Sequence, residues 1–289
     1  MTLDRCAPGI EKINNSCISL DLLIHMTKAY NATYKNKIEL KTNLDSNEYH
    51  KYLLTEIDKR LNKKCNGQKC WTQQKFIDNM DKIKKKELRS HTFRPDGPQG
   101  KFEWLNTINI NQVMKQYENK YSNFKFLGAV PIDFDDLPVL GIQNIKFDDL
   151  ENQGKNNVGV IFNLDEHYKS GSHWVAMFGN LNNGQIYYFD SYGSKPDGRI
   201  INLMKRIGKY CRHKNNNPIK KLDVNYNNRR QQFGHSECGV FSINFILRML
   251  KGEKFGDVLT NPMSDEHVNK CRKIYFNNIS NGEDIFYCE

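Results

Sequence analysis

The feature that most constrains the fold is a run near the C-terminal end of the chain, QQFGHSECGVFSINFILRML, residues 231–250. From Cys238 onward the run is apolar, and its only polar residues are Ser242, Asn244 and Arg248. A helix that is apolar on almost all of its faces is buried in the centre of a domain. The run therefore predicts a central helix with other elements packed around it.

Cys238 stands at the start of this predicted helix, a position that favours a nucleophile. Ser236, two residues earlier, is a favoured N-cap type, and we expect its hydroxyl to accept a hydrogen bond from the first turn. Unpaired N–H groups and the helix dipole in the first turn favour a negative charge. A thiol placed there more readily becomes a thiolate, which is the reactive form. The stretch therefore indicates a cysteine enzyme.

The cysteine content and the lack of long apolar runs indicate the compartment. Eight cysteines in 289 residues are too sparse for a disulfide scaffold, so we expect buried or free thiols. The sequence contains no run of about 18 apolar residues, and its N-terminus has no signal-peptide pattern. We therefore expect no membrane span and a protein that works in a reducing, cytosol-like compartment or is packaged from one.

The net charge of +10 is concentrated in the first third of the chain. Residues 1–100 contain 19 lysines and arginines against 12 aspartates and glutamates. Such an excess favours acidic partners, including nucleic acid. A solvated basic face is the simpler explanation and is favoured, because the sequence contains no nucleic-acid-binding motif.

Residues 1–95 are predicted to form a basic, helical N-terminal arm. Apolar residues at helical spacing predict helices over 19–30, 47–61 and 72–88. A zinc site is an alternative role for four cysteines in this part of the chain, Cys6, Cys17, Cys65 and Cys70. Their spacings fit zinc-ribbon patterns poorly, so buried or free thiols are favoured and no metal is expected.

The stretch HTFRPDGPQGKFEW, residues 91–104, contains the prolines and glycines of a boundary, which we place near residue 95. A helix over 104–121 and a loop over 130–140 are predicted to follow. The pattern then changes to short β-branched and aromatic runs, which predict strands at 158–164, 173–180, 185–190 and 220–227.

A helix is predicted over 199–210, and the residues after 263 form a weak, mixed tail. The predicted fold class is therefore α+β. A small mixed β-sheet packs against the buried helix that carries the nucleophile, within a core domain of residues 96–289, and the helical arm precedes it.

A cysteine nucleophile needs a base, a group that orients the base, and donors for the oxyanion. His173 is the best-placed base, because it begins an apolar strand directly after a Gly-Ser turn. Asp190 ends the next strand and is suited to hold the second imidazole nitrogen, although a turn-forming aspartate is the simpler explanation of that residue alone. Gln232, six residues before Cys238, is expected to join the Cys238 backbone N–H in an oxyanion hole.

The order of these four residues resembles the SUMO-protease and adenovirus-protease superfamily of cysteine peptidases. That family has His, then Asp, Glu or Asn, then Gln and Cys, and here Asp190 follows His173 by seventeen residues. The resemblance covers about residues 104–250 and implies a cysteine endopeptidase that needs no metal or organic cofactor.

A tryptophan segment extends the resemblance. WLNTININQVM, which begins at Trp104, is similar to the family's segment WLND-x-x-IN. The resemblance implies that Trp104 and Trp174 close around a Gly-Gly stretch of the substrate. The aspartate of the family segment is Thr107 here, which leaves the role of that position open.

The N-terminal arm narrows the resemblance. A basic helical arm with a CxxxxC pair, followed by FRPDGP at 93–98, is similar to the virion-maturation proteases of large cytoplasmic DNA viruses, of the African swine fever virus type with giant-virus, mimivirus-like relatives. Asp190 departs from the swine fever enzyme, which has Asn there. The resemblance implies cleavage of capsid or core polyprotein precursors after Gly-Gly type sequences, in the virion and the host cytoplasm.

Two alternatives remain. The first is a deconjugase that removes SUMO or another ubiquitin-like protein from host proteins by acting at its C-terminus. The second is a non-catalytic, basic virion protein. A combined version is also open, in which the basic arm binds DNA or polyprotein and concentrates the enzyme on its substrate.

Overall fold

The computed structural model describes residues 4–98, 103–277 and 288 of the chain. They belong to two compact units, residues 1–96 with 276–278 and residues 97–275 with 279–289, and each unit is described by itself. The functional division into an arm and a catalytic core at residue 95 stays a prediction.

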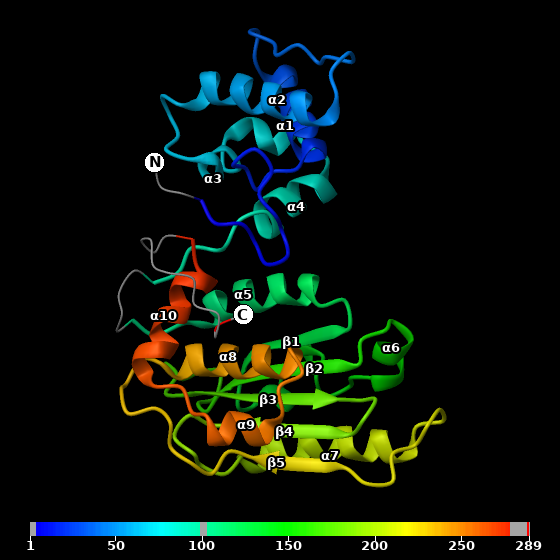
Figure 1. Ribbon diagram of the computed structural model, residues 1–289. Helices are drawn as coiled ribbons and strands as arrows, with labels where there is room; N and C mark the ends of the chain where they lie inside the picture. Colours follow the sequence, from blue (N-terminus) through cyan, green and yellow to red (C-terminus); the bar gives the residue numbers. More distant parts are fainter. Residues whose placement is uncertain (1–3, 99–102, 278–287, 289) are drawn as a thin grey trace. The chain divides into compact units, whose positions relative to one another are not determined.

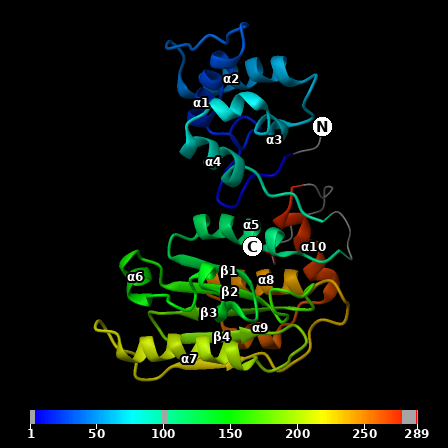
Figure 2. The same cartoon turned by 180° about the vertical axis from the view of Figure 1, so that it is seen from behind.

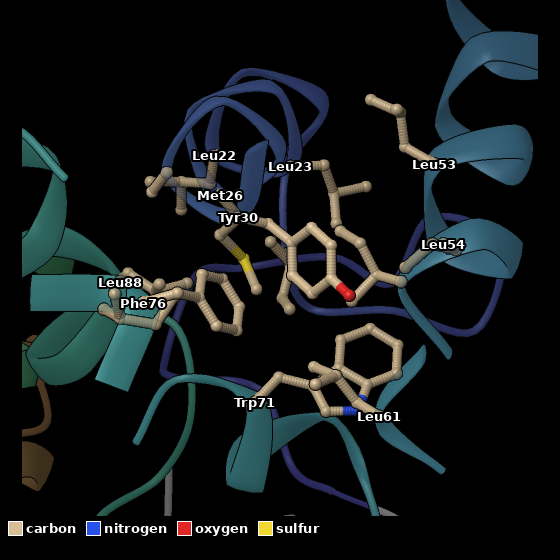
Figure 3. Close-up of a cluster of buried hydrophobic side chains, with 14 of the residues drawn as sticks. Leu22, Leu23, Met26, Tyr30, Leu53, Leu54, Leu61, Trp71, Phe76 and Leu88 are labelled. Carbon is tan, nitrogen blue, oxygen red and sulfur yellow. The ribbon is translucent and has the colours of Figure 1, made fainter. Parts of the chain in front are cut away.

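The N-terminal unit consists of short helices around one apolar core (Figure 1). The elements are α1 (Leu20–Thr33), α2 (Ser46–Leu61), α3 (Gln68–Trp71), the 3-10 helix η1 (Lys75–Asn79) and α4 (Lys82–His91). In Figure 3, Met26, Tyr30 and Phe76 point toward one another, and the Tyr30 and Phe76 rings meet edge to face with centroids 5.4 Å apart. The core therefore depends on aromatic packing between α1 and η1.

The predicted helices over 19–30 and 47–61 are present as α1 and α2, but a single helix over 72–88 is wrong. The chain instead forms η1, passes through extended backbone at Met80, and starts again as α4. The Asp81 side chain accepts hydrogen bonds from the backbone N–H groups of Ile83 and Lys84. The aspartate acts as an N-cap, which ends one element and begins the next.

The expectation of buried or free thiols is wrong for six cysteines, which form the disulfides Cys6–Cys17, Cys65–Cys70 and Cys271–Cys288. The fold brings the Cα atoms of each pair to 5.2–5.4 Å, a distance that a disulfide spans. The four cysteines weighed as zinc ligands are thus bonded in two pairs. Cys211 and Cys238 are free and buried.

The second unit contains the sheet. Its strands are β1 (Phe124–Pro131), β2 (Asn157–Asn163), β3 (Trp174–Asn180), β4 (Gln185–Phe189) and β5 (Asp223–Tyr226), in the order β1-β2-β3-β4-β5. β1 is parallel to β2 and β4 is parallel to β5, whereas β3 is antiparallel to both β2 and β4. This small mixed sheet with its helices confirms the predicted α+β class.

The other elements of this unit are α5 (Thr107–Lys120), η2 (Phe134–Asp136), η3 (Pro138–Leu140), α6 (Phe147–Asn152), α7 (Gly198–His213), α8 (Cys238–Leu250), α9 (Phe255–Thr260) and α10 (Asp265–Tyr275). The helix predicted from residue 104 begins at Thr107, because Asn106 and Asn109 form a capping box. None of the described helices is long and apolar enough to cross a membrane.

Helices cover both faces of the sheet (Figures 1 and 2). Tyr188 belongs to the core that includes the buried face of α7, whereas its neighbour Phe189 stacks on Phe245 of α8 at 5.0 Å. Successive strand residues point to opposite faces, so α7 and α8 lie on opposite sides of the sheet. Eleven residues of α8 are buried, and each large apolar side chain contributes about 2 kcal/mol to stability. The first residue of this central helix, Cys238, is therefore held to the core.

Candidate active site

Cys238 is the first residue of α8 and is 3% exposed. The residue before it, Glu237, occupies the N-cap position without a side-chain capping bond. The prediction that Ser236 caps the helix is therefore wrong. Glu237 already has helical backbone angles, and the Ser236 hydroxyl donates to its carboxylate at 2.9 Å.

His173 and Asp190 meet at one end of the sheet. His173 directly precedes β3 and Asp190 directly follows β4, and these strands pair with Ala176 opposite Phe189. This antiparallel register brings the start of one strand beside the end of the other. The His173 Nε2 lies 2.6 Å from the Asp190 Oδ1, and both residues are buried.

The turn after β4 fixes the Asp190 carboxylate. Its Oδ1 accepts from the Tyr192 backbone N–H at 2.9 Å and its Oδ2 from that of Ser194 at 3.1 Å. Gly193 has a φ of +77°, and a Cβ there would lie 2.7 Å from the Arg229 backbone. A side chain at this position would be both strained and obstructed, so the turn requires glycine.

The electrostatics of the pair favour a charged imidazole. Burial lowers the pKa of His173, but hydrogen bonds with Asp190 and Cys238 outweigh it and raise the value to about 9. Burial likewise opposes the charged form of Asp190, yet the hydrogen bond from His173 and the charge on its ring hold the pKa of that carboxyl below its usual value. Since Nε2 faces Asp190, Nδ1 is the ring nitrogen left for the thiol.

An aromatic lid, formed by Tyr192 and Arg230, covers the imidazole. The Tyr192 ring stacks on His173 with centroids 4.5 Å apart and planes 10° apart, and the Arg230 guanidinium lies 5.0 Å from the Tyr192 centroid. The Tyr192 hydroxyl donates to the Gly234 carbonyl at 3.3 Å. The sequence analysis did not identify this lid, although Tyr192 lies two residues from Asp190.

Gln232 is fully buried in the loop that leads to α8. Its Oε1 accepts from the Ser191 hydroxyl at 2.6 Å, and its Nε2 donates to the Gly234 carbonyl at 3.1 Å. The backbone N–H of Gln232 also donates to Ser191 at 3.0 Å. The second N–H of the side-chain amide has no partner within the described ranges. The amide is thus fixed beside the Asp190 turn with one donor free.

A second polar cluster, Glu237 with Asn269 and Arg272, lies on the α10 side of the same loop. The Glu237 carboxylate accepts from the Asn269 amide at 2.8 Å, and Arg272 donates to the Asn269 Oδ1 and the Ser236 carbonyl, both at 2.9 Å. Burial would raise the pKa of Glu237, but the bonds from Asn269 and Ser236 bring it below its usual value. We call this set the α10 cluster.

The α10 helix also holds the loop by its first residue. Asp265 Oδ2 accepts from the backbone N–H groups of Phe233 and Gly234, at 2.9 and 2.7 Å. A Cβ on Gly234 would lie 2.5 Å from the Glu237 carboxylate. The sequence analysis described α10 as part of a weak tail, so it missed every one of these contacts.

Trp104 and Trp174 line one groove, of about 310 Å³, together with the residues that follow Trp104 and the loop around His167. Trp174 is buried, and its indole N–H donates to the Leu105 carbonyl at 2.8 Å, whereas Trp104 is 47% exposed. A Cβ on Gly239 would lie 3.1 Å from Leu105 and 3.4 Å from Trp174. The groove wall is thus packed directly on the first turn of α8.

The structure brings together His173, Asp190, Gln232 and the first turn of α8, and it places the two tryptophans in the neighbouring groove. The chemical roles of these residues stay predictions. The described residues contain no group of His, Cys, Asp and Glu arranged to hold a metal ion. The arrangement is suited to nucleophilic chemistry by a thiolate paired with an imidazolium.

Comparison with known proteins gives consistent matches. Residues 153–282 match the Ulp1 protease family, C-terminal catalytic domain. A putative thiol protease of Acanthamoeba polyphaga mimivirus is 41% identical over an alignment of 288 residues, which covers 94% of this chain and 93% of that protein. The SUMO-1 cysteine protease of African swine fever virus is 27% identical over 261 residues, which cover 81% of this chain and 92% of that protein.

The fold has also been solved in a relative. The crystal structure of the African swine fever virus protease matches this structure with a TM-score of 0.66 and 20% identity, and the match covers 96% of each chain. The similarity shows that the two chains share a fold across both units.

Proposed function

This chain belongs to the Ulp1 protease family and is a cysteine protease, and we propose that it cleaves after Gly-Gly type sequences in viral structural polyprotein precursors. Its relatives in mimivirus and African swine fever virus support a viral setting. As part of the proposal, it acts in the virion and the host cytoplasm.

In the proposed mechanism the Cys238 thiolate attacks the carbonyl carbon of the scissile peptide bond. His173, charged at neutral pH and held by Asp190, donates its proton to the leaving amine and recovers a proton from the water that hydrolyses the acyl-enzyme. The free N–H of the Gln232 amide and the backbone N–H of Cys238 stabilise the oxyanion. The substrate is a protein, and the mechanism uses no cofactor.

The observation that carries the Gly-Gly preference is the packing of the groove. Trp174 is fixed by its bond to Leu105, and both residues contact the first turn of α8, where the nucleophile lies. In the proposal, the substrate strand passes between Trp104 and Trp174, and these rings exclude residues with a Cβ next to the scissile bond. Glycine is the residue that such a channel accepts.

The test compares two reporter peptides that differ by a single methyl group. We expect a Gly-Gly reporter to be cleaved at least about a hundredfold more efficiently than the matched Gly-Ala reporter, measured as kcat/KM. Trp104 is half exposed, so Trp104→Ala should fold normally and narrow this ratio. Equal cleavage of both reporters by the unaltered enzyme would contradict the proposal.

A second candidate substrate is the C-terminus of SUMO or another ubiquitin-like protein. The observation in its favour is the SUMO-1 cysteine protease activity for which the African swine fever virus relative is named. A SUMO-derived C-terminal reporter and a polyprotein-derived Gly-Gly-X peptide separate the two, since each candidate predicts the higher kcat/KM for its own reporter.

We also propose that the basic N-terminal arm, residues 1–95, contacts DNA or polyprotein and concentrates the enzyme on its substrate. The excess of positive charge in residues 1–100 supports this proposal. Binding of duplex DNA to the full chain should weaken steeply with salt if phosphates are the ligand. Salt-independent binding would exclude DNA as the partner of the arm.

A further inference from the structure

A second groove, of about 660 Å³, lies between α7 and the edge strand β5. Its apolar lining includes Ile186 of β4, Met204 of α7, and Leu222 and Val224 at β5. The loop between Asp190 and α7 contributes Lys195 and Pro196 at one end. The proposed mechanism uses none of these residues.

The groove is open because α7 does not cover this face of the sheet as far as its edge strand, β5. β5 is the last strand of the sheet, and Val224 pairs with Ile186 on the face where α7 packs. α7 passes over β4 with Gly208 at the contact, where a Cβ would lie 3.0 Å from Leu222 and 3.5 Å from Ile186. Val224 is left 50% exposed although the strand next to it is buried.

The rim of the groove is basic, with Lys195, Lys205, Lys209 and Arg212. Lys205, Lys209 and Arg212 follow one another at helical spacing on α7, so they form a row along the groove. None of the four forms an ion pair with another residue in the described ranges, and no acidic residue lines the groove.

The nearest acidic residues in the sequence have other partners. Asp197 accepts from the Arg199 backbone N–H and caps α7, and Asp223 accepts from the hydroxyl of Tyr187. The charge of the rim is therefore not neutralised by its own surroundings. A groove with an apolar floor and an uncompensated basic rim is complementary to a ligand that is both apolar and acidic.

We propose that this groove binds a peptide segment in which large apolar side chains alternate with Asp or Glu, and that it serves as a second contact for protein substrates. The apolar side chains enter the floor, and the carboxylates pair with the row of cations on α7. A nucleic-acid strand offers phosphates but no aliphatic groups for the floor. A membrane surface is broad and flat, whereas these apolar residues are recessed between a helix and a strand.

The groove is connected to the site through one short turn. The Ser194 backbone N–H holds the Asp190 carboxylate, and Lys195, the next residue, lines the groove. The Lys195 end of the groove is therefore one residue along the chain from the turn that fixes the Asp190 carboxylate. Substrates that carry such a segment should show a lower KM than short peptides with the same cleavage sequence.

The first measurement is binding and does not depend on proteolysis. The full chain is titrated against a fluorescein-labelled peptide, ELEFELELE, in which apolar side chains alternate with Glu, and polarisation is recorded. Lys205→Glu with Lys209→Glu should weaken binding at least about tenfold. The matched control, Lys146→Glu with Lys254→Glu, makes the same change in net charge at exposed lysines outside the groove and should alter binding less than about twofold.

Val224→Glu tests the floor separately from the rim. The side chain is half exposed, so the variant should fold, and its carboxylate should weaken binding of the acidic peptide at least about fivefold. Two control ligands, the peptide with Ser in place of Leu and Phe, and phosphatidylserine vesicles, should bind weakly and without response to either groove variant.

Equal binding to the rim variant and its control, or equal binding of the Ser peptide, would overturn the proposal. Preferential binding of vesicles would also overturn it and would assign the groove to lipid instead.

The second measurement is kinetic and uses the peptide joined to a Gly-Gly reporter. For this substrate the rim variant should have a higher KM and an unchanged kcat. Cleavage of the short reporter by the same variant should remain normal, which separates failure of the groove from failure of the proposed activity.

Discussion

Two buried polar clusters flank Cys238, and they differ in what they can do. On the sheet side, His173 and Asp190 are joined directly by one 2.6 Å contact, and the imidazole can both give up and take up a proton. On the helix side, Glu237 and Arg272 are joined through Asn269, and a guanidinium stays protonated. The first cluster is built to exchange protons and the second to hold the loop in place.

The largest effect is expected from substitution of the nucleophile or of the imidazole that exchanges protons with it. Cys238→Ala and His173→Ala should each lower kcat/KM for a Gly-Gly reporter by about 10⁴-fold or more, because members of a catalytic unit fail together. Circular dichroism should show a retained fold in both. Full activity of Cys238→Ala would end the assignment of the nucleophile.

Disruption of the α10 cluster should appear first as a lower free energy of unfolding. Arg272→Met leaves the Asn269 Oδ1 and the Ser236 carbonyl without their donor and removes the positive charge near the Glu237 carboxylate. It should lower the free energy of unfolding by about 3 kcal/mol, measured in urea. The pH profile of the remaining activity should keep its shape. A shifted profile with unchanged stability would show that the α10 cluster belongs to the chemistry.

Asp190→Asn should have a milder effect than loss of Cys238, about tenfold to a hundredfold in kcat/KM. The amide can still accept from His173 through its oxygen, but it no longer stabilises the imidazolium by charge. The pKa read from the pH–rate profile should fall in this variant. Loss of all activity would mean that the charge of Asp190 is essential.

The pH dependence of the free energy of unfolding also distinguishes the two clusters. The pKa of His173 is raised from 6.5 to about 9, so its contribution is complete below pH 6.5 and disappears as the pH rises through 9. We expect urea unfolding to lose about 2 kcal/mol between pH 6 and pH 9. His173→Gln should flatten this slope, and an equal slope in the variant would assign it to other groups.

The smallest expected effect concerns the aromatic lid. Tyr192→Leu removes the stacked ring and the hydroxyl bond to Gly234 and should cost about 1 kcal/mol in transition-state stabilisation, roughly a fivefold lower kcat/KM. Tyr192→Phe keeps the ring and should recover most of the activity. Equal loss in both variants would place the effect in the hydroxyl group.

The difference between the clusters also marks what sequence patterns can reveal. His173, Asp190 and Cys238 stand at the ends of strongly apolar runs, and such runs predict where strands and helices begin. The α10 cluster joins residues more than thirty positions apart, and α10 has a mixed pattern that resembles a tail. No local signal indicates which distant polar groups will be buried together.

Other features were missed for local reasons. β1 was not predicted, because the irregular register near Gly128 breaks the alternation of its side chains. The prediction of a single helix over 72–88 did not treat Asp81 as the N-cap of a new helix. The disulfides were missed because pairing depends on the distance between Cα atoms, which spacing along the chain does not give.

The position of α10 has a consequence for the synthesis of the enzyme. The loop before Cys238 is held by Asp265, Asn269 and Arg272, which a ribosome adds after the nucleophile has already been made. A nascent chain therefore carries its thiol on an unsupported loop until α10 has emerged and packed. Proteolysis should begin only after the residues of α10 have been translated, so the order of synthesis itself delays the enzyme from cutting its neighbours on the same polysome.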